Sequence, residues 1–403
     1  MSPATALVAA HVLSMAGYAT FAALLAELRD LWALSNAEAG LIASAFFAGY
    51  IATVSGWTAL TDRIDARRVY LAGALATAAG CAGFGALAQG FATGVLFQAL
   101  LGAGVAGTYM PGLRLLSDRL SGVSQSRYIA VYTSFFGIGT ALSLGFTGAV
   151  APVFGWRAAF ISAAAGPLLA GAMVMALVPG AGGTPRAAAK ITFAALFPVD
   201  AWRKVLAIRS AAGYTLGYVV HCIELFGSRA WMVAFLGYSA GLQAAGSAYP
   251  WNFAAIAAIV NLLAVPASIA GNEVALRIGR RRWIEIAMTG SGACGIALAL
   301  CGAAHWGVVI LLLTAYSMLV MAESATLTAG LVAAAPPALR GAALGLYSLA
   351  GFAGGMLGPS LFGVALDLAG GKDSAAAWAW GYAAIGAGCI AAPVALRLFA
   401  RGR

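Results

Sequence analysis

The sequence predicts an all-α membrane protein with twelve transmembrane helices in two pseudo-symmetric six-helix bundles. The first observation is composition: 62% of the 403 residues are hydrophobic, 9% are charged, and the mean hydropathy is +0.90. A soluble domain has about 25% charged residues, so most of this surface must face lipid. The second is the recurrence of apolar runs of about 20 residues, the length with which an α-helix crosses a bilayer. The third is a set of short motifs that recurs in the two halves of the chain.

Twelve apolar runs are long enough to cross a membrane as helices. They are continuous, whereas the strands of a membrane barrel would alternate between apolar and polar residues. We predict spans at residues 5–26, 38–60, 69–89, 91–114, 128–153, 157–179, 209–236, 249–271, 283–303, 306–333, 341–365 and 376–398.

The distribution of basic residues predicts the orientation. Nineteen of the 23 lysines and arginines fall in loops and tails on one side of the spans; the other four are Arg29, Arg157, Arg229 and Lys372. Because cytoplasmic loops are enriched in these residues, we expect both termini in the cytoplasm and the protein in a bacterial inner (plasma) membrane. The net charge of +10 lies in short loops between spans, so we expect lipid and a small solute as partners, no nucleic acid, and a monomer.

The longest connection that is not strongly apolar lies between the sixth and seventh spans. It opens with glycine and proline and continues with basic residues, which is typical of a cytoplasmic linker. Residues 191–205 within it predict a short amphipathic helix on the membrane surface. The sequence thus predicts an N-terminal six-helix bundle at residues 1–179, a linker at 180–208 and a C-terminal bundle at 209–403.

Two echoes relate the halves. Residues 63–68 and 277–282 both read R-I-x-x-R-R, at an offset of 214 residues. Arg127 and Arg340, before the fifth and eleventh spans, repeat at an offset of 213. Two echoes at nearly the same offset argue against chance and indicate diverged copies, as in transporters with two-fold pseudo-symmetry.

The chain resembles the major facilitator superfamily, along essentially its whole length. The family signature after the second span is close to G-x-L-A-D-R-x-G-R-R, and residues 58–67 keep its leucine, acid, first arginine and last arginine but neither glycine. The second copy keeps the Gly-Arg-Arg ending and has Leu276 in place of the acid. Residues 155–160, which read G-W-R-A-A-F, are also typical of the family, whereas Gln98 stands where the fourth span usually carries an arginine. The resemblance implies a transporter that works by alternating access, with a cavity lined by spans one, four, seven and ten.

The loop signature has a physical interpretation. Asp62, at the inner end of the second span, can pair with neighbouring arginines in one state and release them in another. We therefore predict a conformational latch formed by Asp62, Arg63 and Arg67. The alternative for the arginines is simple anchoring at the cytoplasmic surface of the membrane.

Span seven carries most of the polar residues expected inside the membrane. An ionisable side chain in a span is expensive and is functional by default. Five polar residues at spacings of four and three fall on one helical face, and Arg229 follows them. We predict a substrate-binding or proton-coupling role for Tyr214, Tyr218, His221, Glu224 and Arg229, with His221 and Glu224 forming a proton relay. The alternative is a static trio of His221, Glu224 and Arg229 that fixes helix packing.

Spans one, four and ten complete the predicted site. Glu323 in span ten should face the bundle interior, because lipid does not tolerate an acid, and is assigned to coupling or substrate binding. Its alternative is a structural acid capped by hydroxyl groups. The N-terminal half contributes Tyr18, Gln98 and Tyr109, although the tyrosines could equally be core aromatic residues.

These observations predict a secondary active transporter that moves a small solute, with proton coupling. The sequence holds no GxxxxGK[ST] phosphate-binding motif and no catalytic motif, so we expect neither ATP-driven transport nor an enzyme, and no metal or other cofactor beyond a proton gradient. Acids at mid-membrane favour a neutral or cationic solute. A soft metal ion remains an alternative because methionine, cysteine and histidine occur on the cavity spans. So does export of a drug or metabolite.

Overall fold

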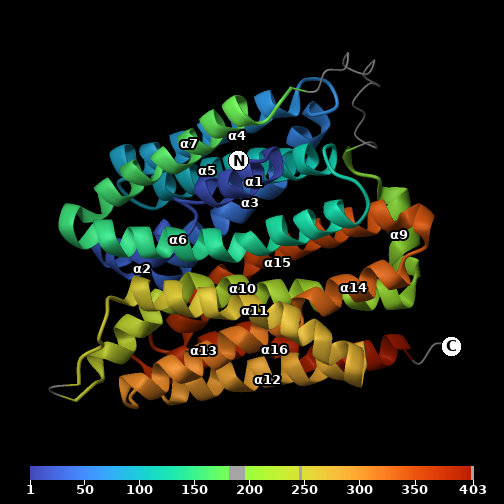
Figure 1. Ribbon diagram of the computed structural model, residues 1–403. Helices are drawn as coiled ribbons and strands as arrows, with labels where there is room; N and C mark the ends of the chain where they lie inside the picture. Colours follow the sequence, from blue (N-terminus) through green and yellow to red (C-terminus); the bar gives the residue numbers. More distant parts are fainter. Residues whose placement is uncertain (181–195, 245–246, 401–403) are drawn as a thin grey trace. The chain divides into compact units, whose positions relative to one another are not determined.

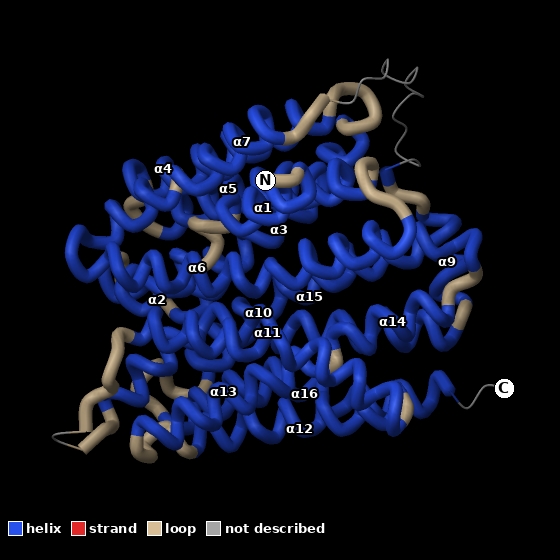
Figure 2. Tube along the Cα trace, viewed as in Figure 1, coloured by secondary structure: helices blue, strands red, loops and turns tan. Residues whose placement is uncertain are grey.

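The computed structural model describes residues 1–180, 196–244 and 247–400, and for residues 122, 123, 126, 130 and 392–400 it describes the backbone alone. Every regular element in these ranges is a helix (Figures 1 and 2). The predicted all-α class is confirmed.

Nine helical stretches in the described residues are long and apolar enough to cross a membrane. Six of them are single helices: α3 (Asn36–Leu60), α4 (Ala66–Leu87), α5 (Phe91–Ser117), α10 (Arg209–Gly241), α11 (Phe253–Ile278) and α12 (Arg280–Leu300). The other three join neighbouring elements: α6 (Gly122–Ala163) with α7 (Ala165–Leu177), α13 (Trp306–Ala322) with α14 (Ser324–Ala334), and the 3-10 helix Pro337–Leu339 with α15 (Arg340–Leu368). Shorter apolar helices are α1 (Pro3–Ser14) and the part Ala375–Ala391 of α16 (Ala375–Ala400). The count of twelve spans stays a prediction.

Four of the predicted spans differ in their detail. The first is two helices, α1 and α2 (Thr20–Leu31), joined by a turn. The tenth breaks at Glu323, between α13 and α14. The fifth and sixth run together through α6, where Gly155 has φ 82°, a backbone conformation that glycine adopts without strain.

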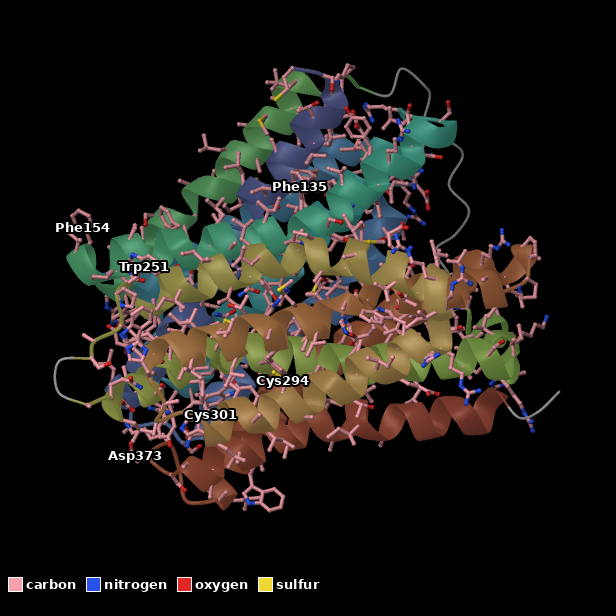
Figure 3. The ribbon with its side chains drawn as sticks, turned by 60° about the horizontal axis from the view of Figure 1, so that its bottom comes forward. Phe135, Phe154, Trp251, Cys294, Cys301 and Asp373 are labelled. Atoms are coloured by element: carbon pink, nitrogen blue, oxygen red, sulfur yellow. The ribbon has the colours of Figure 1, made fainter. Side chains whose placement is uncertain are left out.

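The G-W-R sequence at this break has a structural explanation. Phe154, just before Gly155, is 71% exposed (Figure 3), whereas Trp156 is buried. Arg157 Nη1 donates to the carbonyl oxygen of Gly85 at 2.9 Å, near the end of α4, and its guanidinium lies over the Trp156 ring. A carbonyl at a helix C-terminus lacks an intrahelical partner, and Arg157 supplies one. This hydrogen bond joins the part of α6 that follows the kink at Gly155 to the end of α4.

The chain forms two compact units. One comprises Met1–Leu24 and Ala45–Phe197, and the other comprises Leu25–Ser44 and Pro198–Arg403. The difference from the predicted bundles is Leu25–Ser44, which includes the end of α2 and the start of α3 and belongs with the second unit. Helix α9 (Val199–Ala207) occupies part of the predicted amphipathic segment, while residues 181–195 of the linker, with Arg186 and Lys190, lie outside the described residues.

Glycine allows the helices of each unit to approach closely. In the first unit, a Cβ atom at Gly73 of α4 would lie 2.3 Å from the carbonyl carbon of Gly107 of α5. In the second, a Cβ atom at Gly358 of α15 would lie 2.3 Å from the carbonyl oxygen of Ile223 of α10. Backbone therefore packs on backbone, as is common where helices pack in lipid without a hydrophobic driving force between them.

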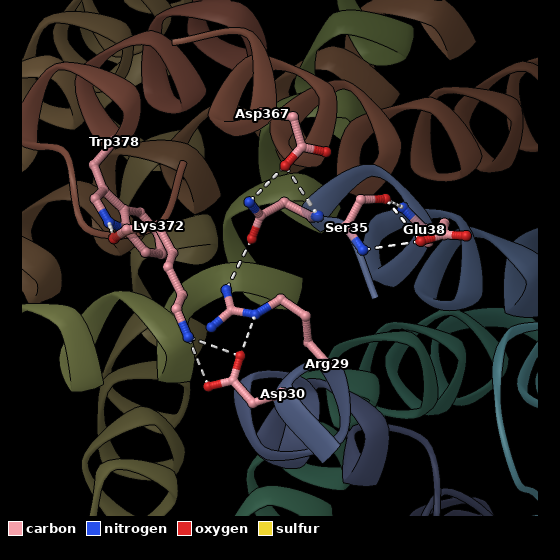
Figure 4. A network of polar contacts seen from close by, with 8 residues as sticks. Arg29, Asp30, Ser35, Glu38, Asp367, Lys372 and Trp378 are labelled. Atoms are coloured by element: carbon pink, nitrogen blue, oxygen red, sulfur yellow. Dashed lines mark hydrogen bonds and ion pairs between the residues drawn. The ribbon is translucent and has the colours of Figure 1, made fainter. Parts of the chain in front are cut away.

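A polar network holds Leu25–Ser44 within the second unit (Figure 4). Asp367, at the end of α15, accepts hydrogen bonds from the backbone N–H of Asn36 at 3.1 Å and of Ala37 at 2.8 Å. These are unpaired N–H groups of the first turn of α3, so Asp367 caps that helix from another part of the chain. Lys372 pairs with Asp30 of α2 at 2.8 Å. We call Arg29, Asp30, Asn36, Asp367 and Lys372 the hairpin network.

The hairpin network should weaken in acid. Partial burial acts to raise the pKa of the Asp30 carboxyl, but hydrogen bonds from Lys372 and Arg29 hold it below its ordinary value of 3.8. A lowered pKa means that the ion pair stabilises the folded state above that ordinary value and loses this contribution as the pH falls through the folded-state pKa. Because Asp30 is half exposed, the contribution is at most about 1 kcal/mol.

We therefore expect hydrogen exchange of residues 29–44, corrected for its intrinsic pH dependence, to rise up to about fivefold between neutral pH and pH values well below 3.8. Lys372→Met should reduce that difference, because it removes one of the two cations that pair with Asp30 and leaves only Arg29. An equal pH effect in Lys372→Met and wild type would rule out this ion pair as the cause.

Candidate functional site

The candidate site centres on α10 and on the break between α13 and α14. His221 Nδ1 lies 3.0 Å from Glu323 Oε1, and the two side chains are 1% and 0% exposed. Glu323 is the single residue between the two helices: it is the C-cap of α13 and the N-cap of α14. The structure thus brings together two predicted site residues that are 102 positions apart in the sequence.

This pair can hold one proton without a net charge. A neutral imidazole beside a carboxylic acid and an imidazolium beside a carboxylate are both neutral overall, and the shared contact fits either. Removing the proton leaves one negative charge in a poorly solvated place, which is costly. His221 Nε2 and Glu323 Oε2 accept or donate no hydrogen bond among the described residues. The pair therefore has hydrogen-bonding capacity left over for water or a solute.

Aromatic rings fix the position of the imidazole. The Tyr218 ring stacks on His221 with centroids 5.6 Å apart, and the Tyr347 ring of α15 stacks on Tyr218 at 3.8 Å. Tyr347 and Thr328 of α14 share a hydrogen bond between hydroxyl groups at 3.1 Å. A Cβ atom at Gly351 would lie 2.2 Å from the Tyr218 ring, so a larger residue there would displace the stack.

Tyr214, one turn before Tyr218, packs in the same way. A Cβ atom at Gly330 of α14 would lie 2.2 Å from the Tyr214 ring. The α10 face predicted from the spacing thus faces α14 and α15 at Tyr214 and Tyr218. Both tyrosines are partly buried.

Glu224 has different partners from His221. Its Oε2 lies 2.7 Å from Ser291 Oγ of α12, and the side chain is 1% exposed. The predicted relay from His221 to Glu224 is therefore replaced by a contact from His221 to Glu323. Arg229, the third member of the alternative trio, places Nη2 3.7 Å from the Met321 sulfur.

The first unit contains the remaining predicted residues. Gln98 is 1% exposed, and its Nε2 donates no hydrogen bond among the described residues. Tyr18 packs edge-on against Phe46 and Phe136. The rings of Tyr109 and His11 pack in a T-shaped arrangement, and the His11 ring stacks on Tyr132 with centroids 4.4 Å apart. These residues belong to an aromatic core with buried polar groups.

The structure places Asp62 and Arg67 of the predicted latch in separate ion pairs. Asp62 forms an ion pair with Arg114 of α5, and Arg114 Nη1 also lies 3.0 Å from Thr61 Oγ1. Arg67 instead pairs with Asp65 at 2.7 Å and donates to the carbonyl oxygen of Val178 at 3.1 Å. In the sequence, Arg114 is one of the nineteen basic residues on the predicted cytoplasmic side, at the end of the fourth span. Its position at the same membrane end as Asp62 was the signal that could have identified it.

The His221–Glu323 contact predicts an unusual pattern of stabilities. His221→Leu or Glu323→Leu alone leaves one buried polar group without its partner, which costs about 3–5 kcal/mol. The double variant removes both groups, and we expect it to recover part of that loss. Thermal unfolding of the four proteins in one detergent measures this, with Glu285→Gln as a control outside the pair. Additive losses in the double variant would contradict a direct interaction.

The family model of the Major Facilitator Superfamily matches residues 7–359. A bacterial homolog to the human lysosomal transporter Spinster has a similar structure, with a TM-score of 0.73, 16% identity and coverage of 99% of this chain and 95% of that one. The nucleoside transporter NupG gives 0.75 and 14%, with full coverage of both chains. A POT family transporter gives 0.77 and 13%, with 98% and 96% covered. Identities this low show the fold alone.

A curated relative, the niacin transporter NiaP of Acinetobacter baylyi, is 33% identical over 136 residues. The match spans 32% of this chain and 29% of that protein, so this chain covers less than a third of the relative. The family is one of membrane transporters, and the match to it confirms the prediction that the protein is not an enzyme. Given a family match across most of its length and apolar helices able to span a membrane, the chain belongs to the Major Facilitator Superfamily.

Proposed function

We propose that the protein is a secondary active transporter that moves a small solute by alternating access and couples that movement to protons. The observation that carries the proposal is the buried His221–Glu323 pair, which has the chemistry to bind and release one proton. Its position supports the proposal too. Glu323 lies at the junction of α13 and α14, inside a helical stretch long and apolar enough to span a membrane, and an ionisable residue in such a place is functional by default.

The proposal extends to twelve spans in two bundles, both termini in the cytoplasm of a bacterial inner membrane, and a monomer. The charge distribution of the sequence supports the orientation. Asp62 and Arg114 form the latch in this proposal. Their ion pair joins the end of α3 to α5 at the signature loop, where a change of partner would accompany a change of state.

The solute is a small organic molecule, neutral or cationic in the form that is carried. Tyr18, Gln98 and Tyr109 offer ring faces and an amide that suit a planar heterocycle. Transporters of niacin and of nucleosides among the similar proteins support that class, and nicotinate and uridine are the first solutes to test. Nicotinate would travel in a neutral form if its carboxylate moved with the coupled proton.

Neither alternative from the sequence gains specific support. Met318 is 41% exposed, and Met321 and Met232 lie near Arg229 and Asn261. Groups of three or more histidine, cysteine or acidic side chains able to hold a metal are absent from the described residues. Export of a drug or metabolite would use the same His221–Glu323 pair. Reversing the pH gradient in the proteoliposome assay tests export against import.

Gradient-driven accumulation in proteoliposomes tests the proposal. A gradient of about one pH unit can drive roughly tenfold accumulation of a neutral solute that moves with one proton. Glu323→Gln and His221→Gln should abolish this accumulation of nicotinate or uridine and retain exchange between equal pools, because exchange needs no net proton transfer. The control is Glu285→Gln, which removes an acid paired with Arg281 at the start of α12. Accumulation that survives Glu323→Gln would sink the proposed coupling site.

A further inference from the structure

The hydroxyl of Ser291 in α12 lies between two oxygen atoms. Its Oγ is 2.7 Å from Glu224 Oε2 and 3.0 Å from the carbonyl oxygen of Met288. A serine hydroxyl has one hydrogen to donate, and a backbone carbonyl only accepts. An ionised carboxylate also only accepts, so it would compete with Met288 for that hydrogen and leave one short oxygen–oxygen contact without a bond.

Both distances are satisfied if Glu224 carries a proton on Oε2. The carboxylic acid then donates to Ser291 Oγ, and Ser291 donates to the carbonyl oxygen of Met288. The result is a directed chain of two hydrogen bonds that joins α10 to α12. The alternative, with Glu224 ionised, buries a charge and also breaks the chain.

The surroundings of Glu224 favour the neutral form. Its main electrostatic neighbours are Ser291, Cys389 of α16, Glu323 and Tyr316 of α13, and none of these is a cation. A Cβ atom at Gly386 of α16 would lie 3.5 Å from Glu224 Oε1 and 3.1 Å from the Gly292 Cα of α12. The two helices therefore close around a carboxyl that is 1% exposed.

Glu224 and Glu323 thus differ in where a proton could go. Glu323 shares its contact with the His221 imidazole, a base that can take up a proton. The chain from Glu224 ends at a peptide carbonyl, which does not take up a proton under these conditions. A proton on Glu224 therefore has no acceptor along its hydrogen bonds.

We propose that Glu224 is a neutral carboxylic acid that keeps its proton and ties α10 to α12 through Ser291, so that the His221–Glu323 pair alone exchanges a proton in each cycle. The last clause rests on the proposed function, whereas the protonation of Glu224 does not. Glu224 is in this assignment a positioning residue for α10, the helix that carries His221.

Infrared spectroscopy of the full-length protein in lipid vesicles tests the assignment without a solute. A buried carboxylic acid shows a C=O stretching band that a carboxylate lacks. We expect a band that is present from about pH 6 to about pH 8, where an exposed glutamate is ionised. It should be lost in Glu224→Gln and retained in Glu323→Gln. Ser291→Ala should shift it to higher frequency, because the acid loses its acceptor.

Thr215→Val is the matched control for Ser291→Ala. It removes a buried hydroxyl from α10 that donates to the Ala211 carbonyl of its own helix at 2.9 Å, and the band should not move. If Glu224→Gln does not fold, the shift in Ser291→Ala identifies the band instead. Absence of a Glu224 band at neutral pH, or a band that titrates between about pH 6 and about pH 8, overturns the proposal. Accumulation that survives Glu323→Gln rejects the coupling site and leaves the Glu224 result standing.

Discussion

A carboxyl group that is fully withdrawn from water inside an apolar bundle needs a partner, and for Glu323 that partner is His221. The arrangement of the second unit follows from this contact. The contact requires His221 of α10 and Glu323, between α13 and α14, to lie at the same level along the bundle. Tyr218 stacks on the imidazole, and Tyr347 stacks on Tyr218. The glycines at 330 and 351 make room for Tyr214 and Tyr218, so residues without side chains are as necessary to the pair as its ionisable members.

Each of the two units contains a buried histidine, and the two histidines have different polar neighbours. In the first, His11 meets Tyr109 and stacks on Tyr132; in the second, His221 meets Glu323 and stacks on Tyr218. Glu323 lies 214 residues after Tyr109, the same offset as the R-I-x-x-R-R echo. Each unit thus packs a buried histidine against aromatic rings, and the polar neighbour differs: Glu323 contacts His221 in the second unit. The buried acidic side chains among the described residues, Glu224 and Glu323, both belong to the second unit.

The sequence predicted the fold class and the individual polar residues because both depend on local properties. Apolar runs identify helices for a membrane, and an acid such as Glu323 is conspicuous among them. The partners could not be predicted. Pairing His221 with Glu323 depends on a break between α13 and α14 that no proline or glycine marks, and the Asp62–Arg114 pair joins residues 52 positions apart. The hairpin network depends still more on distant contacts, since Asp30 and Lys372 are separated by 342 residues.

The neutrality of the protonated His221–Glu323 pair has an electrical consequence. A carrier that holds this proton and a neutral solute would cross without moving net charge, whereas the return step without the proton would carry one negative charge on the protein. Each cycle would therefore move one positive charge in the direction of the solute. Such a step is worth about 2.3 kcal/mol for each 100 mV of membrane potential. Voltage alone would therefore drive the cycle at equal pH on both sides, and a retained proton on Glu224 fixes the charge moved at one elementary unit.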